Sequence, residues 1–513
     1  MDLNNSNANI SENNKRIAKN TALLYIRMLL TMLISLYTSR VVLNALGVED
    51  FGIYNIVGSL VVMFNFLNSS MSIAVQRYLS FEIGRGNWNR LNHIFSLSLV
   101  IHIILAVIIV IVAGSIGYWL ISTQLKIPHE RLSAAIWVFG FSILGCCANI
   151  IRIPYNAIII AREKMDMYAY ISILEVILNL GVAYLLIVIV SDKLKLYAIL
   201  VCIVNCIITW YYQFYCKIKF PESHYKPYWN KGLFKELVSF AGWSTMGEIA
   251  WVATIQGGNL LLNVFFGPVV NAARGISYQM TGAINRFVSS FQTAVNPQLI
   301  KCYSTNDKER MFFLLFRSTN FSFYLLLFFA LPLIIETEEI LKIWLKNVPE
   351  YTILFCRLAV INSLIDVLSN LLATAAKAYG RIRTYQMCVS LLLFMNLPLS
   401  YLVLKLGMAP QSVFYIYGII AFLLLIIRIY LLHRMINLPV VVFLRDILYI
   451  FPVTLIAMIL PMIFHIEMSE GFIRLLVVTI VSTVSVAVSV FLIGLKKNER
   501  SIVKDKILYY IKI

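Results

Sequence analysis

The chain has 513 residues, of which 60% are hydrophobic and only 13% are charged. Its mean hydropathy is +0.81, which excludes a soluble globular domain and indicates a membrane protein. The formal net charge is +18, but the basic residues occur in small groups between apolar stretches and not on one folded face. Nucleic acid is therefore not an expected partner.

Long apolar stretches account for most of the chain. The first twenty residues are polar and precede no cleavable apolar segment, so we expect the amino terminus to be retained in the cytoplasm. A bilayer core of ~30 Å requires ~20 apolar residues per helix. This length predicts an all-α integral membrane protein with about 14 transmembrane helices. The predicted spans are 17–42, 51–78, 93–121, 132–160, 167–190, 194–216, 237–266, 268–298, 311–335, 351–376, 384–404, 411–433, 443–465 and 471–495.

The connections between these spans are short and differ in charge on the two sides of the membrane. Most of the lysines and arginines outside the spans lie on the side of the amino terminus, and this excess predicts that both termini are cytoplasmic. The longest outer connection, around Glu336 and Glu350, is acidic. No connection is long enough to form a catalytic domain, so we do not expect an enzyme.

Cysteine and histidine show no pattern typical of metal binding. The eight cysteines lie within spans or on the expected cytoplasmic side, without metal-ligand spacing. The six histidines are scattered, and there is no glycine-rich nucleotide loop. We therefore expect no metal, no cofactor and no direct use of ATP.

The sequence contains an internal repeat of six spans. Six is an even number, so the two copies have the same orientation and are related by a pseudo-twofold axis along the membrane normal. The matching stretches are Asn179-Leu180 and Asn396-Leu397 at an offset of 217, Pro221 and Pro439 at 218, and Leu43-Asn44 and Leu262-Asn263 at 219.

This repeat predicts two six-helix lobes that face each other across a central cavity. The expected segments are a cytoplasmic tail at 1–16, an N-lobe at 17–221, a cytoplasmic linker at 222–230, a C-lobe at 231–439, two further helices at 440–495 and a basic cytoplasmic tail at 496–513. The repeat assigns no role to the two further helices.

We single out seven of the arginines inside the predicted spans. They are Arg27, Arg40, Arg152, Arg274, Arg286, Arg317 and Arg357. Each costs ~2.5–3.5 kcal/mol if it faces lipid at mid-depth, so most should face protein or a water-filled cavity. Arg27 lies about ten residues into its span, ~15 Å deep, and Arg286 is comparably deep, whereas Arg40, Arg274 and Arg357 lie toward the outer side.

Guanidinium groups stay charged and match phosphate geometry with two parallel hydrogen bonds, so the set predicts an anionic substrate. We take Arg27, Arg286, Arg152, Arg274, Arg40 and Arg357 as candidate substrate-binding residues. The alternative is that they pair with Glu175, Glu248 or Asp366 and only hold helices together. Seven arginines outnumber these three carboxylates. Glu248 and Asp366 are also candidates for coupling transport to an ion gradient.

Polar residues follow two of the spans at helical spacing. Asn149, Arg152 and Asn156 share one face of the fourth span, and Asn362, Asp366 and Asn370 share one face of the tenth. We expect these stripes to line the cavity, or else to form hydrogen bonds between helices, which is the more common use.

The amino-terminal region resembles a known family. The stretch from Asn14 to Gly58 and the segment QRYLSFEIGRGN from Gln76 to Asn87 are similar to bacterial polysaccharide flippases of the Wzx type, in the superfamily of the MATE exporters and the lipid II flippases. The most recognisable element is Leu46-Gly47 followed by Phe51-Gly52.

This resemblance implies a MATE-like fold in the bacterial inner membrane. The implied substrate is an undecaprenyl-pyrophosphate-linked oligosaccharide of O-antigen or lipopolysaccharide biosynthesis. The implied mechanism is alternating access, which moves this substrate from the inner to the outer leaflet. The implied partners are the lipid bilayer, a polysaccharide polymerase and its chain-length machinery. The alternatives are a lipid II flippase, a cation-coupled multidrug exporter, which would favour carboxylates over arginines, and a membrane polysaccharide polymerase.

Overall fold

The computed structural model describes residues 2–62, 65–123, 128–189, 192–345, 348–496 and 499–501, and no strand occurs among them. They form two compact units, Met1–Glu248 with Thr293–Asp307, and Ile249–Gln292 with Lys308–Ile513. The division falls within the long helices α7 (Lys231–Phe266) and α8 (Pro268–Ser304). The predicted lobe boundaries remain a prediction, and residues 497–498 and 502–513 of the predicted basic tail lie outside the described residues.

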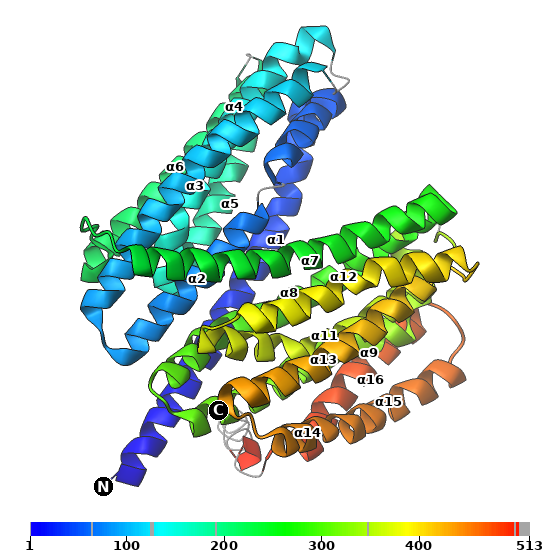
Figure 1. Ribbon diagram of the computed structural model, residues 1–513. Coiled ribbons are helices and arrows are strands. Elements are labelled where there is room, and N and C mark those ends of the chain that lie inside the picture. Colours follow the sequence, from blue (N-terminus) through cyan, green and yellow to red (C-terminus); the bar gives the residue numbers. More distant parts are fainter. Residues whose placement is uncertain are drawn as a thin grey trace, which may run out of the picture. The chain divides into compact units, whose positions relative to one another are not determined.

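The first unit is a bundle around α4 (Figure 1). α4 packs against α2, α3 and α6, and α1 runs along α5. Side chains of α4 such as Val138, Phe139 and Ile150 are buried in its core. The helices are α1 (Asp2–Val62), α2 (Asn65–Arg85), α3 (Trp88–Thr123), α4 (His129–Ala161), α5 (Met165–Val188), α6 (Lys193–Lys219) and the 3₁₀ turn η1 (Pro221–Ser223).

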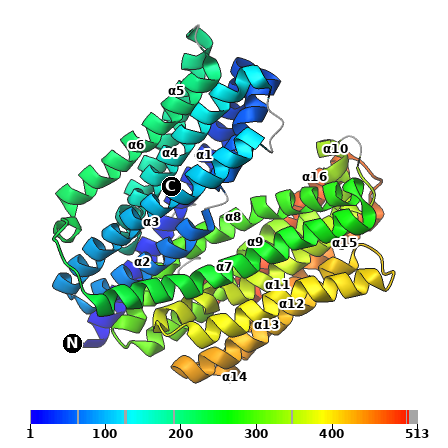
Figure 2. The same cartoon turned by 45° about the horizontal axis from the view of Figure 1, so that its top comes forward.

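The second unit is built around α11, which packs against α9 and α13 (Figure 2). α15 and α16 pack against each other, and α16 also packs against α9. The helices outside the repeat are therefore a pair attached through α9. The elements are α9 (Lys308–Ile335), α10 (Thr337–Leu345), α11 (Thr352–Tyr379), α12 (Arg383–Lys405), α13 (Ser412–Ile436), α14 (Val440–Leu448), α15 (Ile450–Glu467), α16 (Phe472–Ser489) and the π turn η2 (Val490–Gly494).

Twelve helical segments among the described residues are long and apolar enough to cross a membrane. The protein is thus a multi-pass membrane protein, but the predicted count of fourteen is not confirmed. The segments 51–78 and 268–298 do not qualify. The first is divided between α1 and α2 on either side of residues 63–64, which lie outside the described residues, and α8 is long but polar. These are the second and the eighth predicted spans, at equivalent places in the repeat.

Backbone geometry repeats along the chain at nearly the same offset as the sequence. Gly47 kinks α1 at φ 80°, and Gly267 separates α7 from α8 at φ 80°, at the equivalent place in the second copy. Left-handed residues also end α2 at Gly86 and α8 at Asn306, which form a second equivalent pair. Positive φ is unfavourable for most residues. Its recurrence at equivalent positions therefore indicates that the two copies turn in the same way. Gly47 belongs to the Leu-Gly-x-x-x-Phe-Gly element, which therefore marks a helix corner.

The turn after α4 departs from this pattern. Its left-handed residue is Glu163 at φ 60°, whereas the equivalent turn in the second copy, after α11, has Gly380 at φ 91°. The Glu163 amide donates to Ile160 O at 2.8 Å and the Lys164 amide to Ile159 O at 3.0 Å. This is a Schellman cap, a position where glycine is preferred. A glutamate here indicates that its side chain has a use.

That side chain joins three parts of the first unit. The Glu163 carboxylate is 1% exposed and forms ion pairs with Lys301 and with Arg16 Nε at 2.8 Å. Gln298 Nε2 donates to Glu163 Oε2 at 2.9 Å, and Asn20 Nδ2 donates to the Glu163 carbonyl at 3.2 Å. The turn after α4 thereby holds the beginning of α1 and the end of α8.

Removing the Glu163 carboxylate should destabilise the protein, because the partly buried Lys301 would be left without its partner. We expect Glu163→Ala to lower the free energy of unfolding by about 1–3 kcal/mol, measured by denaturant unfolding in detergent. Glu163→Gly should cost less than Glu163→Ala, since glycine relieves the left-handed backbone. Equal stability of Glu163→Ala and wild type would refute this role.

Candidate functional site

In the first unit, two of the predicted arginines meet along one face of α5. Arg27 of α1 donates to Ser172 Oγ at 3.5 Å, and its guanidinium carbon lies 4.6 Å from the centre of the Tyr168 ring. Arg152 of α4 pairs with Glu175 at 3.2 Å. The α5 residues Tyr168, Ser172 and Glu175 share that helix face because their spacing is four and three. We call these five residues the first-unit cluster.

The rest of the α4 stripe lies on the same helix face as Arg152. The side-chain oxygens of Asn149 and Asn156 are buried and accept no hydrogen bond from the described residues. Buried polar atoms are usually paired, so these oxygens are open acceptors. The predicted stripe Asn149, Arg152 and Asn156 is therefore continuous with the first-unit cluster.

In the second unit, Arg274 of α8 is held without a carboxylate among the described residues. Its side chain is almost fully buried. Its Nη2 donates to Ile255 O at 3.3 Å and to the Tyr278 hydroxyl at 3.2 Å, and its guanidinium carbon lies 5.4 Å from the Phe414 ring centre. Aromatic faces attract a cation, but they leave the positive charge unneutralised.

Asp366 of α11 lies in the same unit and receives a hydrogen bond from Tyr417 at 2.7 Å. Arg428 of α13 donates to Ser369 Oγ at 2.7 Å and to Ser369 O at 3.0 Å, one helical turn from Asp366. We call Arg274, Tyr278, Asp366, Tyr417 and Arg428 the second-unit cluster. Each cluster therefore has two arginines and one carboxylate.

Arg428 was not among the predicted arginines, because it lies five residues before the end of the predicted span 411–433 and resembles a flanking charge. The structure places it beside Ser369, one helical turn from Asp366. Arg428 and Asp366 lie on different helices, so no periodic pattern in the sequence links them.

The remaining candidates lie elsewhere. Arg40 and Arg286 are exposed, and neither forms an ion pair with a described residue. Arg357 donates from Nε to Ile334 O at 3.1 Å. Arg317 pairs with Glu499, which the sequence analysis did not consider as a partner. Glu248 is half-buried on α7.

The α11 stripe divides between uses. Asn362 donates to Phe414 O at 3.0 Å and so links α11 to α13. Asp366 belongs to the second-unit cluster, and Asn370 is exposed. Spacing alone put the three residues on one face, but α13 covers only part of it.

The two clusters carry charge that the described residues do not neutralise. Of the six candidate arginines, Arg152 alone forms an ion pair with a carboxylate in the described part of the chain. A buried guanidinium without a carboxylate keeps hydrogen-bond donors and positive charge available for an anion. The arrangement can bind phosphate or carboxylate groups.

Solved structures share this fold. An outward-facing multidrug resistance MATE family transporter of the MOP superfamily aligns with a TM-score of 0.71 at 13% identity, over 83% of this chain and 97% of that one. A MATE structure in the bent conformation gives 0.71 at 14% identity, over 84% and 96%. A MOP superfamily transporter from Pyrococcus furiosus, described by a binding pocket of reverse polarity that suggests a different function, gives 0.68 at 14% identity, over 82% and 95%. A comparison with curated protein sequences found no match.

The class that these features define is a multi-pass membrane protein with a MATE-like fold. Within this class, the chain belongs to the polysaccharide biosynthesis protein family, whose model matches residues 17–302, more than half of its length. The predicted all-α, MATE-like fold and the resemblance to this family are confirmed.

A glycine makes room for the second-unit cluster and offers a test of it. A Cβ added at Gly258 would lie 2.5 Å from Arg274 Nη2 and 2.8 Å from its Cζ, whereas one added at Gly242 on the same helix meets nothing within 4 Å. We expect Gly258→Ala to displace the enclosed guanidinium and to slow transport about tenfold, equivalent to ~1.4 kcal/mol.

The measurement is the transport rate of purified protein in liposomes, with Gly242→Ala as the matched control. If Gly258→Ala transports its substrate at the wild-type rate, the position of Arg274 does not affect transport.

Proposed function

We propose that this protein flips an undecaprenyl-pyrophosphate-linked oligosaccharide from the inner to the outer leaflet of a bacterial inner membrane. One observation carries the proposal: within a polysaccharide biosynthesis family, the arginines in the described spans outnumber the carboxylates that pair with them. A pyrophosphate group is an anion that arginine forks match well, through two parallel hydrogen bonds.

Movement follows an alternating-access cycle, with both termini in the cytoplasm. Each unit by itself offers donors to a pyrophosphate, from Arg27 and Arg152 in the first unit and from Arg274 and Arg428 in the second. Asn149 and Asn156 supply acceptor oxygens beside Arg152, which suit the hydroxyl groups of a sugar. A polysaccharide polymerase and its chain-length machinery would receive the flipped product.

The alternatives differ in the charge that their substrates require. A multidrug exporter for cationic drugs favours carboxylates, but the described clusters have two arginines for each carboxylate. The fold does not decide this point, because solved relatives of one fold include a pocket of reverse polarity. The substrate of a lipid II flippase also contains a pyrophosphate. The two substrates therefore differ only in the identity of the glycan.

A strain that lacks the gene tests the proposal. We expect the lipid fraction of this strain to accumulate a pyrophosphate-linked oligosaccharide that stays inaccessible from the periplasm, and the intact gene to clear it. Mass spectrometry of the lipid fraction identifies the glycan. Accumulation of lipid II instead would favour the alternative flippase, and no accumulation of either would refute a flippase function.

Single arginine variants test the binding role. Arg27→Ala and Arg274→Ala should each lower flipping at least about tenfold without loss of folded protein, since a charge-assisted hydrogen bond contributes ~1.5–3 kcal/mol. Arg27→Lys should retain part of the activity because the charge remains and the planar fork is lost.

The readout is clearance of the accumulated lipid-linked oligosaccharide in the complemented strain. Arg381→Ala, at an exposed arginine between α11 and α12, is the matched control. If both alanine variants clear the intermediate like wild type, the assignment of these arginines is wrong.

A further inference from the structure

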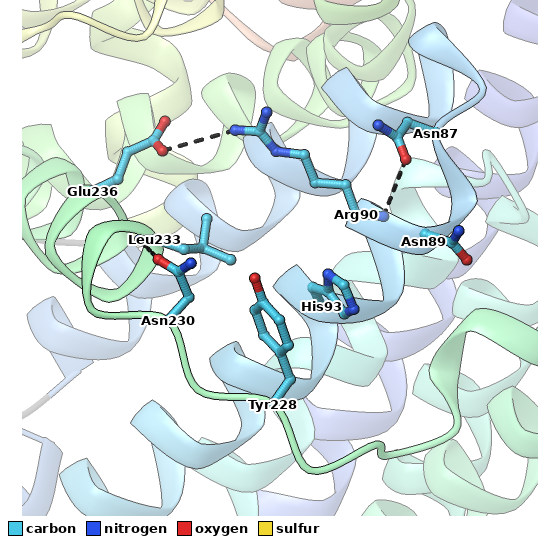
Figure 3. Close-up of a pocket in the computed structure, with 8 residues that line it drawn as sticks. All are labelled: Asn87, Asn89, Arg90, His93, Tyr228, Asn230, Leu233 and Glu236. Atoms are coloured by element: carbon cyan, nitrogen blue, oxygen red, sulfur yellow. Dashed lines mark hydrogen bonds and ion pairs between the residues drawn. The ribbon is translucent and has the colours of Figure 1, made fainter.

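A polar pocket of about 420 Å³ lies in the first unit, and none of its lining residues belongs to the first-unit cluster (Figure 3). One wall comes from the turn between α2 and α3 and the first turns of α3. The other wall comes from the connection after η1 and from the beginning of α7. Its volume lies within the ~300–1,000 Å³ typical of small-ligand sites.

The connection that forms the second wall is fastened along one face of α3. Asn92 Nδ2 donates to Glu222 O at 2.8 Å and to His224 O at 2.7 Å. The Lys226 amide donates to Ser96 Oγ at 3.1 Å. These bonds hold the connection in place, so the two walls are positioned without a ligand.

An aromatic pair forms the side of the pocket. The rings of His93 and Tyr228 are stacked with centres 3.7 Å apart and planes 2° from parallel. The π faces of such rings attract the C–H bonds of a sugar ring, which carry partial positive charge.

The lining contains side chains of both charges, and it offers both hydrogen-bond donors and acceptors. Arg90 Nη2 lies 3.9 Å from Glu236, and Arg90 Nε lies 3.3 Å from Glu82. Asn87 and Asn230 use their side-chain oxygens to accept from the Arg90 and Leu233 amides at 3.1 and 3.0 Å. Their amide nitrogens donate to no described residue.

This balance selects the class of ligand. A phosphate would meet the Glu236 carboxylate in the lining, which opposes an anion. A neutral ligand that has many hydroxyl groups can use both the donors and the acceptors, because each hydroxyl donates once and accepts twice. A pyranose ring suits this lining, because the aromatic pair can contact its C–H bonds and the planar amide, guanidinium and carboxylate groups can bind its hydroxyls.

We propose that this pocket binds one or two neutral sugar units of the glycan carried by the substrate. The inference rests on the proposed function, since it takes the sugar from the lipid-linked glycan that the proposed flippase moves. The pocket lies at the same end of the first unit as the turn after α4, because Arg162 in that turn pairs with Glu222 at the start of the connection. In the proposed topology this end is cytoplasmic, where the lipid-linked glycan is assembled before it is moved.

The test uses full-length protein in nanodiscs of phosphatidylethanolamine and phosphatidylglycerol. The probes are glucose, galactose, mannose, N-acetylglucosamine and N-acetylgalactosamine, each alone, with inorganic pyrophosphate as the anionic comparison. Saturation-transfer difference NMR measures Kd. We expect at least one sugar to bind saturably in about the millimolar range, and pyrophosphate not to compete with it.

Tyr228→Ala should weaken sugar binding at least tenfold by removing the aromatic face, and Glu236→Gln should weaken it severalfold. Tyr225→Ala is the matched control, because Tyr225 is an exposed tyrosine of the same connection that does not line the pocket. Saturable binding by none of the sugars, displacement by pyrophosphate, or equal binding by Tyr228→Ala and Tyr225→Ala would each overturn the proposal.

These results are independent of the deletion strain. If the strain accumulates the lipid-linked oligosaccharide and no sugar binds, the pocket assignment alone fails. If sugar binds through Tyr228 and the strain accumulates nothing, the flippase function fails and the pocket remains a sugar site.

Discussion

A guanidinium group inside a bilayer must be enclosed by protein or water, because it does not lose its charge. For Arg27 and Arg274 that constraint is met without a carboxylate among the described residues. Arg27 lies over an aromatic ring, and Arg274 lies between aromatic rings and donates to a backbone carbonyl. Gly258 leaves the space that the Arg274 guanidinium occupies. Positive charge is thus stabilised but not cancelled, which is what a site for an anion requires.

The duplication provides the frame that holds these arginines. Left-handed residues recur at equivalent helix ends of the two copies, so both copies turn at the same places. The clusters themselves do not repeat residue by residue. Arg152 and Ser369 occupy equivalent positions, and the second copy supplies Arg428 from α13 to contact that serine. The turn after α4 has diverged in the same way, since Glu163 replaces the glycine of the other copy and holds Lys301.

The connection between the copies is also more than a spacer. Asn92 and Ser96 fasten it to α3, and Tyr228 stacks on His93. The segment leads into α7, which both units share. Its packing creates a polar surface on which positive and negative charges offset each other, unlike the cationic clusters.

The sequence alone predicted the membrane class, the all-helical fold and the family, because these depend on local composition, helix period and short motifs. It also selected Arg27, Arg152, Arg274 and Asp366 as chemically unusual. It did not determine which arginines are neutralised. Arg152 and Glu175 pair across two helices, Arg317 meets Glu499 from the far end of the chain, and Arg428 reaches Ser369. Such distances in sequence leave no periodic signal, so only the packing of the helices decided which charges remain open to a substrate.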